Sequence, residues 1–482
     1  MQDFIILVNL DDKTCYALAR MLRADGVYCR IMPGTVTADE LLQANTRGVI
    51  LASACTGHAQ SLPQMMDYVQ SGLPMLCLGD AALSLCQTLG GSITDVAEGG
   101  IVTANLDAED PLFTGIEDSE RFLPLLRGMV FTEDEGRACA MVTDKVIGLH
   151  MRQRDVWGLA VALERNDPAT AMLLGNFCKN VCGCTAWWSE RAFIERAKAQ
   201  IAEAAGDGDA LCALSGGVDS GVTALLGYLA LGQKLHCIFV DTGFLRQGEA
   251  DEVMDAFQTQ LGLNVRRVDA RAEFLLALKA VSDPGEKERI IRSLLREILR
   301  READALPNVK LILRGTNYAD TIAPEDASAP DAIPVIEPVR ELFKDEIRHV
   351  GESLGMPPII TGRQPFPGSG LATRIMATVT AERLDILRTA DAIFRREIEA
   401  AGLQKRLWQY YAALSVSPLP GGGLIMVLRA VQPSEGGAGL PARLPFDLLE
   451  RVTADITRDC PDVQRVFYDC TPSRSYAMQA GK

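Results

Sequence analysis

Short apolar runs alternate with helical patterns over residues 1–185. Continuous apolar runs bounded by turn residues predict buried parallel strands, here FIILVNL, GVILAS and LPMLCLGD. Two segments with apolar positions at helical spacing end in glycine and predict helices, TCYALARMLRADG and ALSLCQTLGG. The first 185 residues are therefore predicted to form one α/β domain with short connections.

A second α/β pattern follows over residues 186–365. A helical segment that begins at Ser189 leads into three apolar strands, and each strand precedes a loop and another helical segment: ALCAL, KLHCIFVDTGF and VKLILRGT. From residue 366 to residue 482, a Pro/Gly loop and a long amphipathic helix lead into a strand, a helix and a strand. The predicted fold class is thus two doubly wound α/β domains followed by a small α+β domain.

Composition narrows the class of protein. The 482 residues carry a formal net charge of −15, which argues against nucleic acid as a partner because phosphate backbones select basic surfaces. No run of 18 apolar residues occurs, and the N-terminus lacks a basic region and cleavage site, so we expect no membrane partner and a cytoplasmic location. The thirteen cysteines are predicted to be reduced thiols. We interpret Cys178, Cys182 and Cys184 as buried or linker residues, since no histidine lies near them.

The chemistry-bearing motif is Ser215-Gly216-Gly217-Val218-Asp219-Ser220, between a predicted strand and a predicted helix. Glycines let backbone N–H groups approach a phosphate chain, and the helix N-terminus adds its positive dipole end. The two serines add hydroxyl donors, and Asp219 can hold Mg²⁺ against the phosphates. The complete motif in this context favours phosphate binding over a simple glycine turn. It is not a Walker P-loop, because no Gly-Lys-Ser/Thr follows.

This motif resembles the signature of PP-loop ATP pyrophosphatases, which cleave ATP between the α and β phosphates. Further segments resemble GMP synthases: FVDTGFLRQGEADEVM, DPGEKERIIR, RGTNYADTI, IEPVRELFKDEIR and RQPFPGSGLATR. The C-terminal VLRAV, LPFDLLERV and RVFYD are similar to the dimerisation domain of that family. The N-terminal GVYCRI, PMLCLGDAALSLCQTLGG and NFCKNVCGCTAWW resemble its class I glutamine amidotransferase domain and linker. The resemblance covers almost the whole chain.

The resemblance implies an ATP- and Mg²⁺-dependent ligase that adenylates xanthosine monophosphate (XMP) and aminates it with ammonia, and that forms a homodimer through its C-terminal domain. It also implies site residues. Asp219 and Lys344 are assigned to catalysis, Arg363 and Arg374 to binding of the acceptor, and Asp219 and Asp320 to the metal ion. The residues assigned to binding of ATP or pyrophosphate are Ser215, Gly216, Gly217, Val218, Asp219, Ser220, Asp241, Lys287 and Arg289. Structural alternatives stay open for several of them: a turn cap for Asp241, a helix cap for Asp320, and surface charge pairing for the lysines and arginines.

The amidotransferase-like domain departs from its family at three places. Gly79 stands where the nucleophilic cysteine is expected, with Asp80 after it, and the nearby Cys77 and Cys86 are predicted to lie in the strand and in the helix. The His-Pro-Glu segment aligns with Ala162, Leu163 and Glu164, so the base is missing, and residues 52–55 replace the oxyanion-hole loop. We therefore predict no glutaminase activity, with ammonia taken free or from a separate glutaminase.

Two departures in the synthetase half concern the acceptor. Only APEDASAPDAIPV bridges Ala323 to Val335, where the family has a long lid, and the chain ends in DCTPSRSYAMQAGK instead of the family's lysine-containing tail. Arg474 or Lys482 could take the place of that lysine. Two other interpretations stay open: a ligase repurposed for a different carbonyl substrate, and a nucleotide-binding regulatory pseudoenzyme. The intact Ser215–Ser220 motif argues against the latter.

Overall fold

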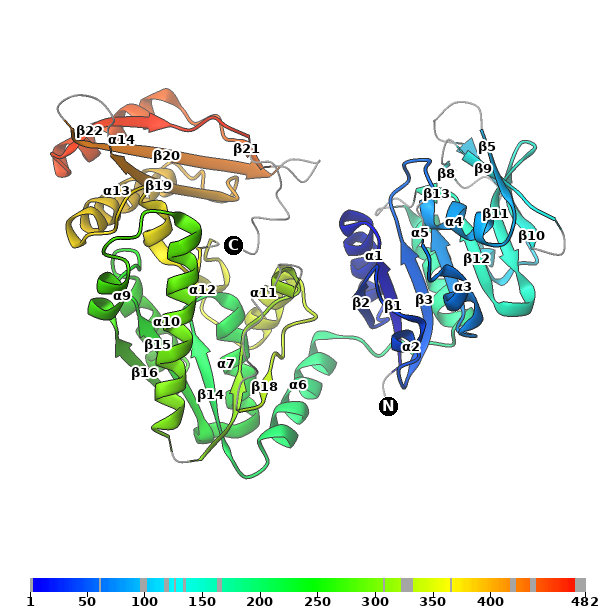
Figure 1. Cartoon of the computed structure of the whole chain (residues 1–482), viewed down its shortest axis with the longest axis horizontal. Coiled ribbons are helices and arrows are strands. Elements are labelled where there is room, and N and C mark those ends of the chain that lie inside the picture. Colours follow the sequence, from blue (N-terminus) through cyan, green and yellow to red (C-terminus); the bar gives the residue numbers. More distant parts are fainter. Residues whose placement is uncertain are drawn as a thin grey trace. The chain divides into compact units, whose positions relative to one another are not determined.

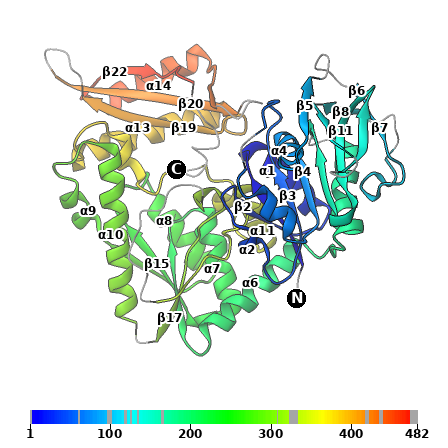
Figure 2. The same cartoon turned by 45° about the vertical axis from the view of Figure 1, so that its right-hand side comes forward.

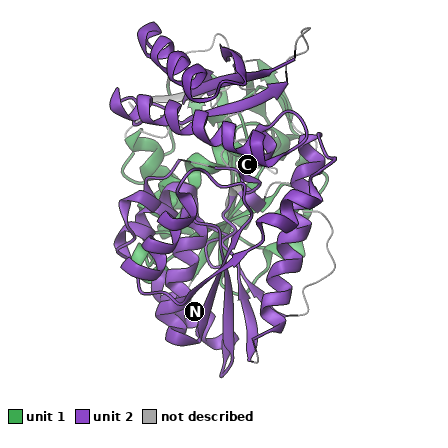
Figure 3. Cartoon of the chain, turned by 90° about the vertical axis from the view of Figure 1, so that its left-hand side faces the viewer, with its two compact units in different colours: residues 1–193 green, residues 194–482 purple. Residues whose placement is uncertain are grey.

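The computed structural model describes residues 3–59, 62–95, 102–116, 121–124, 127–132, 136–162, 167–306, 308–321, 333–364, 366–416, 422–433 and 439–472. The chain divides into two compact units, Met1–Phe193 and Ile194–Lys482 (Figure 3). None of the helices within these ranges is long and apolar enough to cross a membrane.

The first unit is built on a mixed sheet with the strand order β2-β1-β3-β4-β12-β11-β10-β7, extended by β5 and β9. The strands β2, β1, β3, β4 and β12 run parallel, and β11 and β10 continue the sheet in antiparallel pairing. The strands of this sheet are β1 (Phe4–Asn9), β2 (Cys29–Pro33), β3 (Thr46–Ala52), β4 (Met75–Leu78), β5 (Ser92–Asp95), β7 (Asn105–Leu106), β9 (Arg127–Val130), β10 (Arg137–Val142), β11 (Lys145–Met151) and β12 (Val156–Leu159). A separate three-stranded sheet has the order β13-β8-β6, with β6 (Val102–Thr103), β8 (Arg121–Pro124) and β13 (Val161–Ala162). The α-helices of the first unit are α1 (Asp12–Ala24), α2 (Ala38–Leu41), α3 (Met65–Gln70), α4 (Asp80–Thr88) and α5 (Pro168–Gly175).

The second unit contains a five-stranded, fully parallel sheet with the order β16-β15-β14-β17-β18. The chain moves outward from β14 through β15 to β16, and then returns to the other side of β14 as β17. The crevice at the carboxyl end of β14 therefore lies at a topological switch point, where α/β sheets bind ligands. These strands are β14 (Asp209–Leu214), β15 (Leu235–Asp241), β16 (Val265–Asp269), β17 (Val309–Leu313) and β18 (Val335–Ile336).

Helices cover both faces of this sheet, with α10 on one side and α7 on the other (Figures 1 and 2). The apolar alternation of β14 explains the two layers: Leu211 joins a core with Ile291 and Ile298 of α10, whereas the buried face of α7 packs on the opposite side. The α-helices of this part are α6 (Glu190–Ala205), which begins in the first unit, α7 (Val218–Leu231), α8 (Glu249–Met254), α9 (Arg271–Ala277), α10 (Pro284–Asp304), α11 (Lys344–Ser353) and α12 (Pro358–Thr361).

The C-terminal part is an α+β layer whose core is continuous with the parallel-sheet part. One buried cluster includes Phe244 after β15, Leu371 in the Pro/Gly loop, Phe394 in α13 and Met426 in β20. The elements are α13 (Ala381–Ala400), β19 (Gln409–Val416), β20 (Leu424–Pro433), β21 (Gly439–Pro441), α14 (Phe446–Asp459) and β22 (Val463–Tyr468). The predicted fold class is confirmed. The domain boundary proposed at residue 365 stays a prediction, because the second unit is compact as a whole.

Candidate functional site

The Ser215–Ser220 motif forms the turn between β14 and α7, as predicted. Gly216 has a φ of +80°, and a Cβ there would lie 2.5 Å from Val253 Cγ2, so the tight turn requires glycine. The hydroxyl groups of Ser215 and Ser220 lie 2.9 Å apart, and Gly217 N–H donates to Ser215 Oγ at 3.3 Å. The N–H groups of the first turn of α7 have no partner within the helix, and Val218 and Asp219 of this turn line a cavity. The turn thus offers the donors that a phosphate chain needs.

Asp219, in the first turn of α7, is the acidic centre of the site. Its Oδ2 accepts hydrogen bonds from Lys344 Nζ and, at 3.2 Å, from Asn317 Nδ2. Its Oδ1 is buried and has no partner among the described residues. Asp320 lines the same cavity, and burial together with the charge of Asp219 raises the pKa of the Asp320 carboxyl. Asp219 Oδ1 accepts no hydrogen bond from these residues, and a second carboxyl group lines the same cavity. Carboxylate oxygens of this kind are suitable ligands for Mg²⁺.

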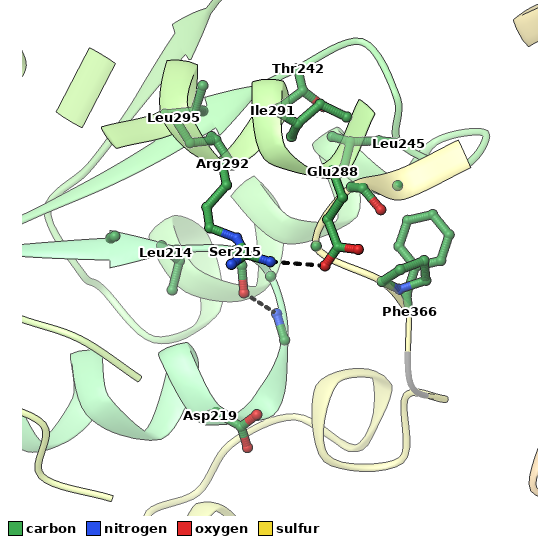
Figure 4. Close-up of a pocket in the computed structure, with 18 of the residues that line it drawn as sticks. Leu214, Ser215, Asp219, Thr242, Leu245, Glu288, Ile291, Arg292, Leu295 and Phe366 are labelled. Carbon is green, nitrogen blue, oxygen red and sulfur yellow. Dashed lines mark hydrogen bonds and ion pairs between the residues drawn. The ribbon is translucent and has the colours of Figure 1, made fainter. Parts of the chain in front are cut away.

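A cavity of about 670 Å³ opens beside the motif. One wall comes from α10, whose residues Glu288, Ile291, Arg292 and Leu295 face the motif (Figure 4). Arg292 extends towards Ser215, and its Nη2 lies 3.0 Å from Glu288 Oε1. The cavity therefore combines the apolar side chains of Ile291 and Leu295, which suit a purine base, with charged groups and a polar end at the phosphate loop.

A second cavity of about 330 Å³ shares Pro367 and Thr373 with the first. Arg374 lines it, although its side chain is only 6% exposed. The guanidinium of Arg374 lies 4.3 Å from the Tyr411 ring centroid and 3.5 Å from Asp391 Oδ1, and its Nη2 donates to no partner in the described part of the chain. The Pro/Gly loop thus lies between the cavity beside the Ser215–Ser220 motif, called the nucleotide cavity below, and a smaller cavity lined by the buried Arg374.

Known proteins are similar to this chain over almost its whole length. The family model for the GMP synthase C terminal domain matches residues 396–477. The glutamine-hydrolyzing GMP synthase of Caldicellulosiruptor saccharolyticus is 35% identical, and the match covers 97% of this chain and 98% of that protein. Proteins of the same name from Clostridium perfringens and Listeria monocytogenes are 35% and 34% identical, over 98% of this chain and 98% and 96% of theirs. The chain belongs to the GMP synthase family.

Within this GMP synthase family member, the structure corrects two predicted phosphate contacts. Lys287 is fully buried, and its Nζ donates to the carbonyl oxygens of Ala372, Ile375 and Ala377, at 3.2, 2.6 and 2.7 Å. It therefore holds the segment after the Pro/Gly loop and does not face pyrophosphate. Arg289 has a side chain that is 65% exposed, lies 3.9 Å from Glu286, and is absent from the lining of the cavity.

The sequence analysis did not predict the face of α10 that lines the cavity, which includes Glu288, the residue between Lys287 and Arg289. Glu288, Ile291, Arg292, Leu295 and Leu299 line the cavity. Their spacing of three, one, three and four residues places them on one side of a helix. That periodicity is visible in the sequence, but only the fold shows which face of the helix lines the cavity.

Two other predicted contacts have structural roles in this family member. Asp241 is 4% exposed, and its carboxylate accepts from Gly243 N–H at 3.0 Å and Arg267 Nη2 at 2.6 Å. It is therefore the turn cap that was left open as an alternative, and the next residue, Thr242, lines the cavity. Asp320 lines the cavity, and its Oδ2 accepts from Asn317 N–H at 3.0 Å; its contact with a metal ion stays a prediction.

Arg363 lines the cavity of about 670 Å³ and forms a hydrogen bond with the backbone of the phosphate loop. Its Nη1 donates to Gly216 O at 3.0 Å and lies 3.2 Å from Glu249 Oε1, and its Nη2 donates to Glu252 Oε2 at 3.1 Å. With all these contacts, Arg363 supports the ATP end of the site. A direct contact between Arg363 and the acceptor stays a prediction.

At the position expected for the glutaminase nucleophile, the turn at Gly79 has no room for a side chain. Gly79 has φ 66° and ψ −132°, the sharp bend between β4 and α4 at which a nucleophile would stand. A Cβ at Gly79 would lie 2.7 Å from Ala54 O and 2.8 Å from Ser53 O. Asp80 N–H, the amide expected to face an oxyanion, instead donates to Ala54 O at 2.9 Å. Ala162 ends β13, whereas Leu163 and Glu164 lie outside the described residues.

The cysteines predicted to be buried are buried. Cys77 lies in β4 and Cys86 in α4, as expected, and Cys178, Cys182 and Cys184 are at most 8% exposed. Burial raises the pKa of the Cys178 thiol, which keeps this group protonated and unreactive. The described residues contain no group of three or more side chains arranged to hold a metal ion.

Proposed function

We propose that the chain is an ATP-dependent ligase that adenylates the carbonyl oxygen of XMP, or of a related nucleotide, and then aminates it with ammonia. AMP and pyrophosphate are the other products. The observation that carries the proposal is the phosphate loop with Asp219, Lys344 and a nucleotide-sized cavity beside it. The names of the relatives, glutamine-hydrolyzing GMP synthases, support XMP as the first acceptor to test.

The chemistry follows from the charges around the phosphate loop. The acceptor oxygen attacks the α-phosphorus of ATP, pyrophosphate leaves, and ammonia then displaces AMP from the activated carbon. The loop N–H groups and Lys344 hold the phosphates where negative charge develops on the leaving pyrophosphate. Asp219 orients the Lys344 ammonium, and with Asp320 it would hold Mg²⁺, which when bound neutralises phosphate charge.

The second cavity is the place where we propose that the acceptor binds. It adjoins the nucleotide cavity at Pro367 and Thr373, so an acceptor there can reach the α-phosphate. The buried guanidinium of Arg374 has an unused N–H donor and suits a phosphate-bearing ligand. The short bridge over Ala323–Val335, whose residues 323–332 lie outside the described residues, favours the second candidate, a ligase for a different carbonyl substrate.

A titration of XMP against ATP, Mg²⁺ and ammonium tests the acceptor. Without the family's long lid and tail lysine, we expect a high KM for XMP, with one pyrophosphate and one GMP formed per turnover. A tail lysine contributes roughly 1.5–3 kcal/mol, or about one to two decades in affinity. Pyrophosphate release without GMP, or release only with another carbonyl compound, would favour the second candidate. Failure of every acceptor despite ATP binding would support the regulatory pseudoenzyme.

Glutamine is not expected to serve as an ammonia donor for the purified chain. Gly79 has no thiol to form a thioester, and Ala162 cannot accept a proton. Incubation with glutamine should release no glutamate, whereas ammonium salts should support synthesis. Gly79→Cys should not create the activity, because the added side chain meets Ala54 O and Ser53 O. Glutamate release by the unmodified chain would contradict this part of the proposal.

The C-terminal part is proposed to form a homodimer. Phe446 of α14 and Phe467 of β22 are 74% and 50% exposed, and both border a groove of about 500 Å³ with Leu449 and Val466. Exposed aromatic side chains around an apolar groove are typical of protein interfaces. Light scattering at micromolar concentration should give the mass of two chains. Phe446→Ser with Phe467→Ser should shift it to one chain, and a wild-type monomer would refute the assignment.

A further inference from the structure

The carboxylate of Asp80 is enclosed by a loop of the first unit. The residue is fully buried. Both of its carboxylate oxygens accept from Thr56 N–H, at 3.0 and 3.1 Å, and Gly57 N–H donates to Oδ1 at 3.0 Å. Thr56 Oγ1 donates to Oδ2 at 2.6 Å. Two backbone amides and one hydroxyl group therefore surround a single anionic side chain.

The same loop is fixed to the turn at Gly79 by bonds on its other side. Ser53 Oγ donates to Leu78 O at 2.6 Å and accepts from Ala81 N–H at 2.8 Å. Ala54 O accepts from Asp80 N–H at 2.9 Å. The loop is thus held in place at both ends, and its amides at Thr56 and Gly57 stay directed at one point.

Such an arrangement is how a protein binds a small anion. Consecutive backbone N–H groups directed inward form an anion-binding nest, and charge-assisted bonds to them are stronger than neutral ones. No salt bridge joins Asp80 to a cation within the described ranges, so these three donors compensate the buried charge. The donors would otherwise be free for an external carboxylate or an oxyanion.

We propose that residues 53–57 form an anion-binding nest and that Asp80 is its tethered occupant, filling the site where an external anion would bind. The unit is thereby kept permanently in an anion-bound state beside the Gly79 turn. This inference goes beyond the ligase function and does not depend on it. It predicts that removing the carboxylate opens a site for a small monocarboxylate.

Hydrogen exchange of the full-length chain tests the proposal. In Asp80→Ala, the amides of Thr56 and Gly57 should exchange roughly ten- to a hundredfold faster, because they lose bonds to a charged acceptor. Sodium formate should restore their protection in a saturable manner, whereas sodium chloride of equal ionic strength should not. No acceleration in Asp80→Ala, or equal effects of both salts, would overturn the proposal.

Asp167→Ala is the matched control. Asp167 also accepts from two backbone amides and a threonine hydroxyl, Ala169 N–H, Thr170 N–H and Thr170 Oγ1, but it caps α5 and is half-buried. Those amides should also exchange faster, but formate should restore them only weakly, because this half-buried cap lies open to water. Equal rescue of both variants would show non-specific binding and refute the nest.

Asp80→Asn keeps the experiment decisive if Asp80→Ala unfolds the unit. The amide has the same shape, but it turns an N–H₂ group towards the N–H donors. Strands β1 and β3 should keep their protection while Thr56 and Gly57 exchange faster, and formate should have no effect because the site is filled. Wild-type protection at Thr56 and Gly57 in this variant would show that the charge does not hold the loop.

Discussion

Asp219→Ala is expected to abolish pyrophosphate release, with a fall in rate of about a thousandfold or more. The substitution removes the buried Oδ1 that suits Mg²⁺ and the Oδ2 that orients Lys344 and Asn317. The phosphate loop keeps its shape, because Ser215, Ser220 and Gly217 bond to one another and not to Asp219. The loss should therefore appear in the rate while the far-ultraviolet circular dichroism stays unchanged.

A control aspartate lies on β14, the strand that leads into the phosphate loop, at the strand's amino end. Asp209 begins β14, and its Oδ2 lies 2.8 Å from His236 Nε2. Asp209→Asn removes one negative charge from the same domain and should change the rate less than about twofold, since surface pairs contribute little. Pyrophosphate release with ATP, ammonium and a saturating acceptor measures both variants. Full turnover by Asp219→Ala, or equal losses in both, would refute the assigned ATP site.

Local sequence patterns were sufficient to predict many of the strands and the phosphate loop at the centre of the candidate site. The Ser215–Ser220 motif contains its own geometry, because the glycine turn, the serine pair and the first helical turn are contiguous in sequence. The apolar runs predicted β1, β3, β4, β14, β15 and β17 for the same reason, since each run is long enough to need burial on both faces. The partners of Asp219 depend on folding, because Asn317 and Lys344 lie 98 and 125 residues further along the chain.

The orientation of a long helix could not be read from its charges. On α10, Lys287 and Arg289 looked suited to phosphate because they are basic, yet Lys287 is turned into the core and Arg289 towards solvent. Lys287 can be buried because three backbone carbonyl groups accept hydrogen bonds from its ammonium group, although burial lowers the pKa of Lys287 to about 8. Those carbonyl groups come from a segment more than 80 residues away, so no local pattern reveals them.

The sequence predicts the loss of the glutaminase residues, but it does not predict the contacts that Asp80 makes in the fold. Glycine and alanine, Gly79 and Ala162, stand where the family resemblance implies a nucleophile and a base. That Asp80 then fills the nest of residues 53–57 depends on contacts 23 and 24 residues apart in the chain. An aspartate at a helix start ordinarily indicates a cap, and only the fold shows it facing another loop.

The arginines that flank the Pro/Gly loop are expected to act on different substrates. Arg374→Met removes the cation of the second cavity and should raise the KM of the acceptor about ten- to a hundredfold, with the KM of ATP within about twofold. Asp391 keeps two of its contacts, Arg246 Nε at 3.2 Å and Ala412 N–H at 3.1 Å, so the variant should fold. Arg374→Lys should recover only part of the affinity, because it keeps the charge and loses the planar fork.

Arg363→Met, at the other end of the same loop, should raise the KM of ATP and not that of the acceptor. Losing its bond to Gly216 O and its pairs with Glu249 and Glu252 loosens the phosphate turn, so the KM of ATP should rise about tenfold. The acceptor KM should change far less, because this guanidinium does not line the second cavity. Initial rates over a grid of both substrates separate the effects, and thermal melting confirms folding. If both variants raised the same KM, the two cavities would not hold separate substrates, and the acceptor would have to bind elsewhere.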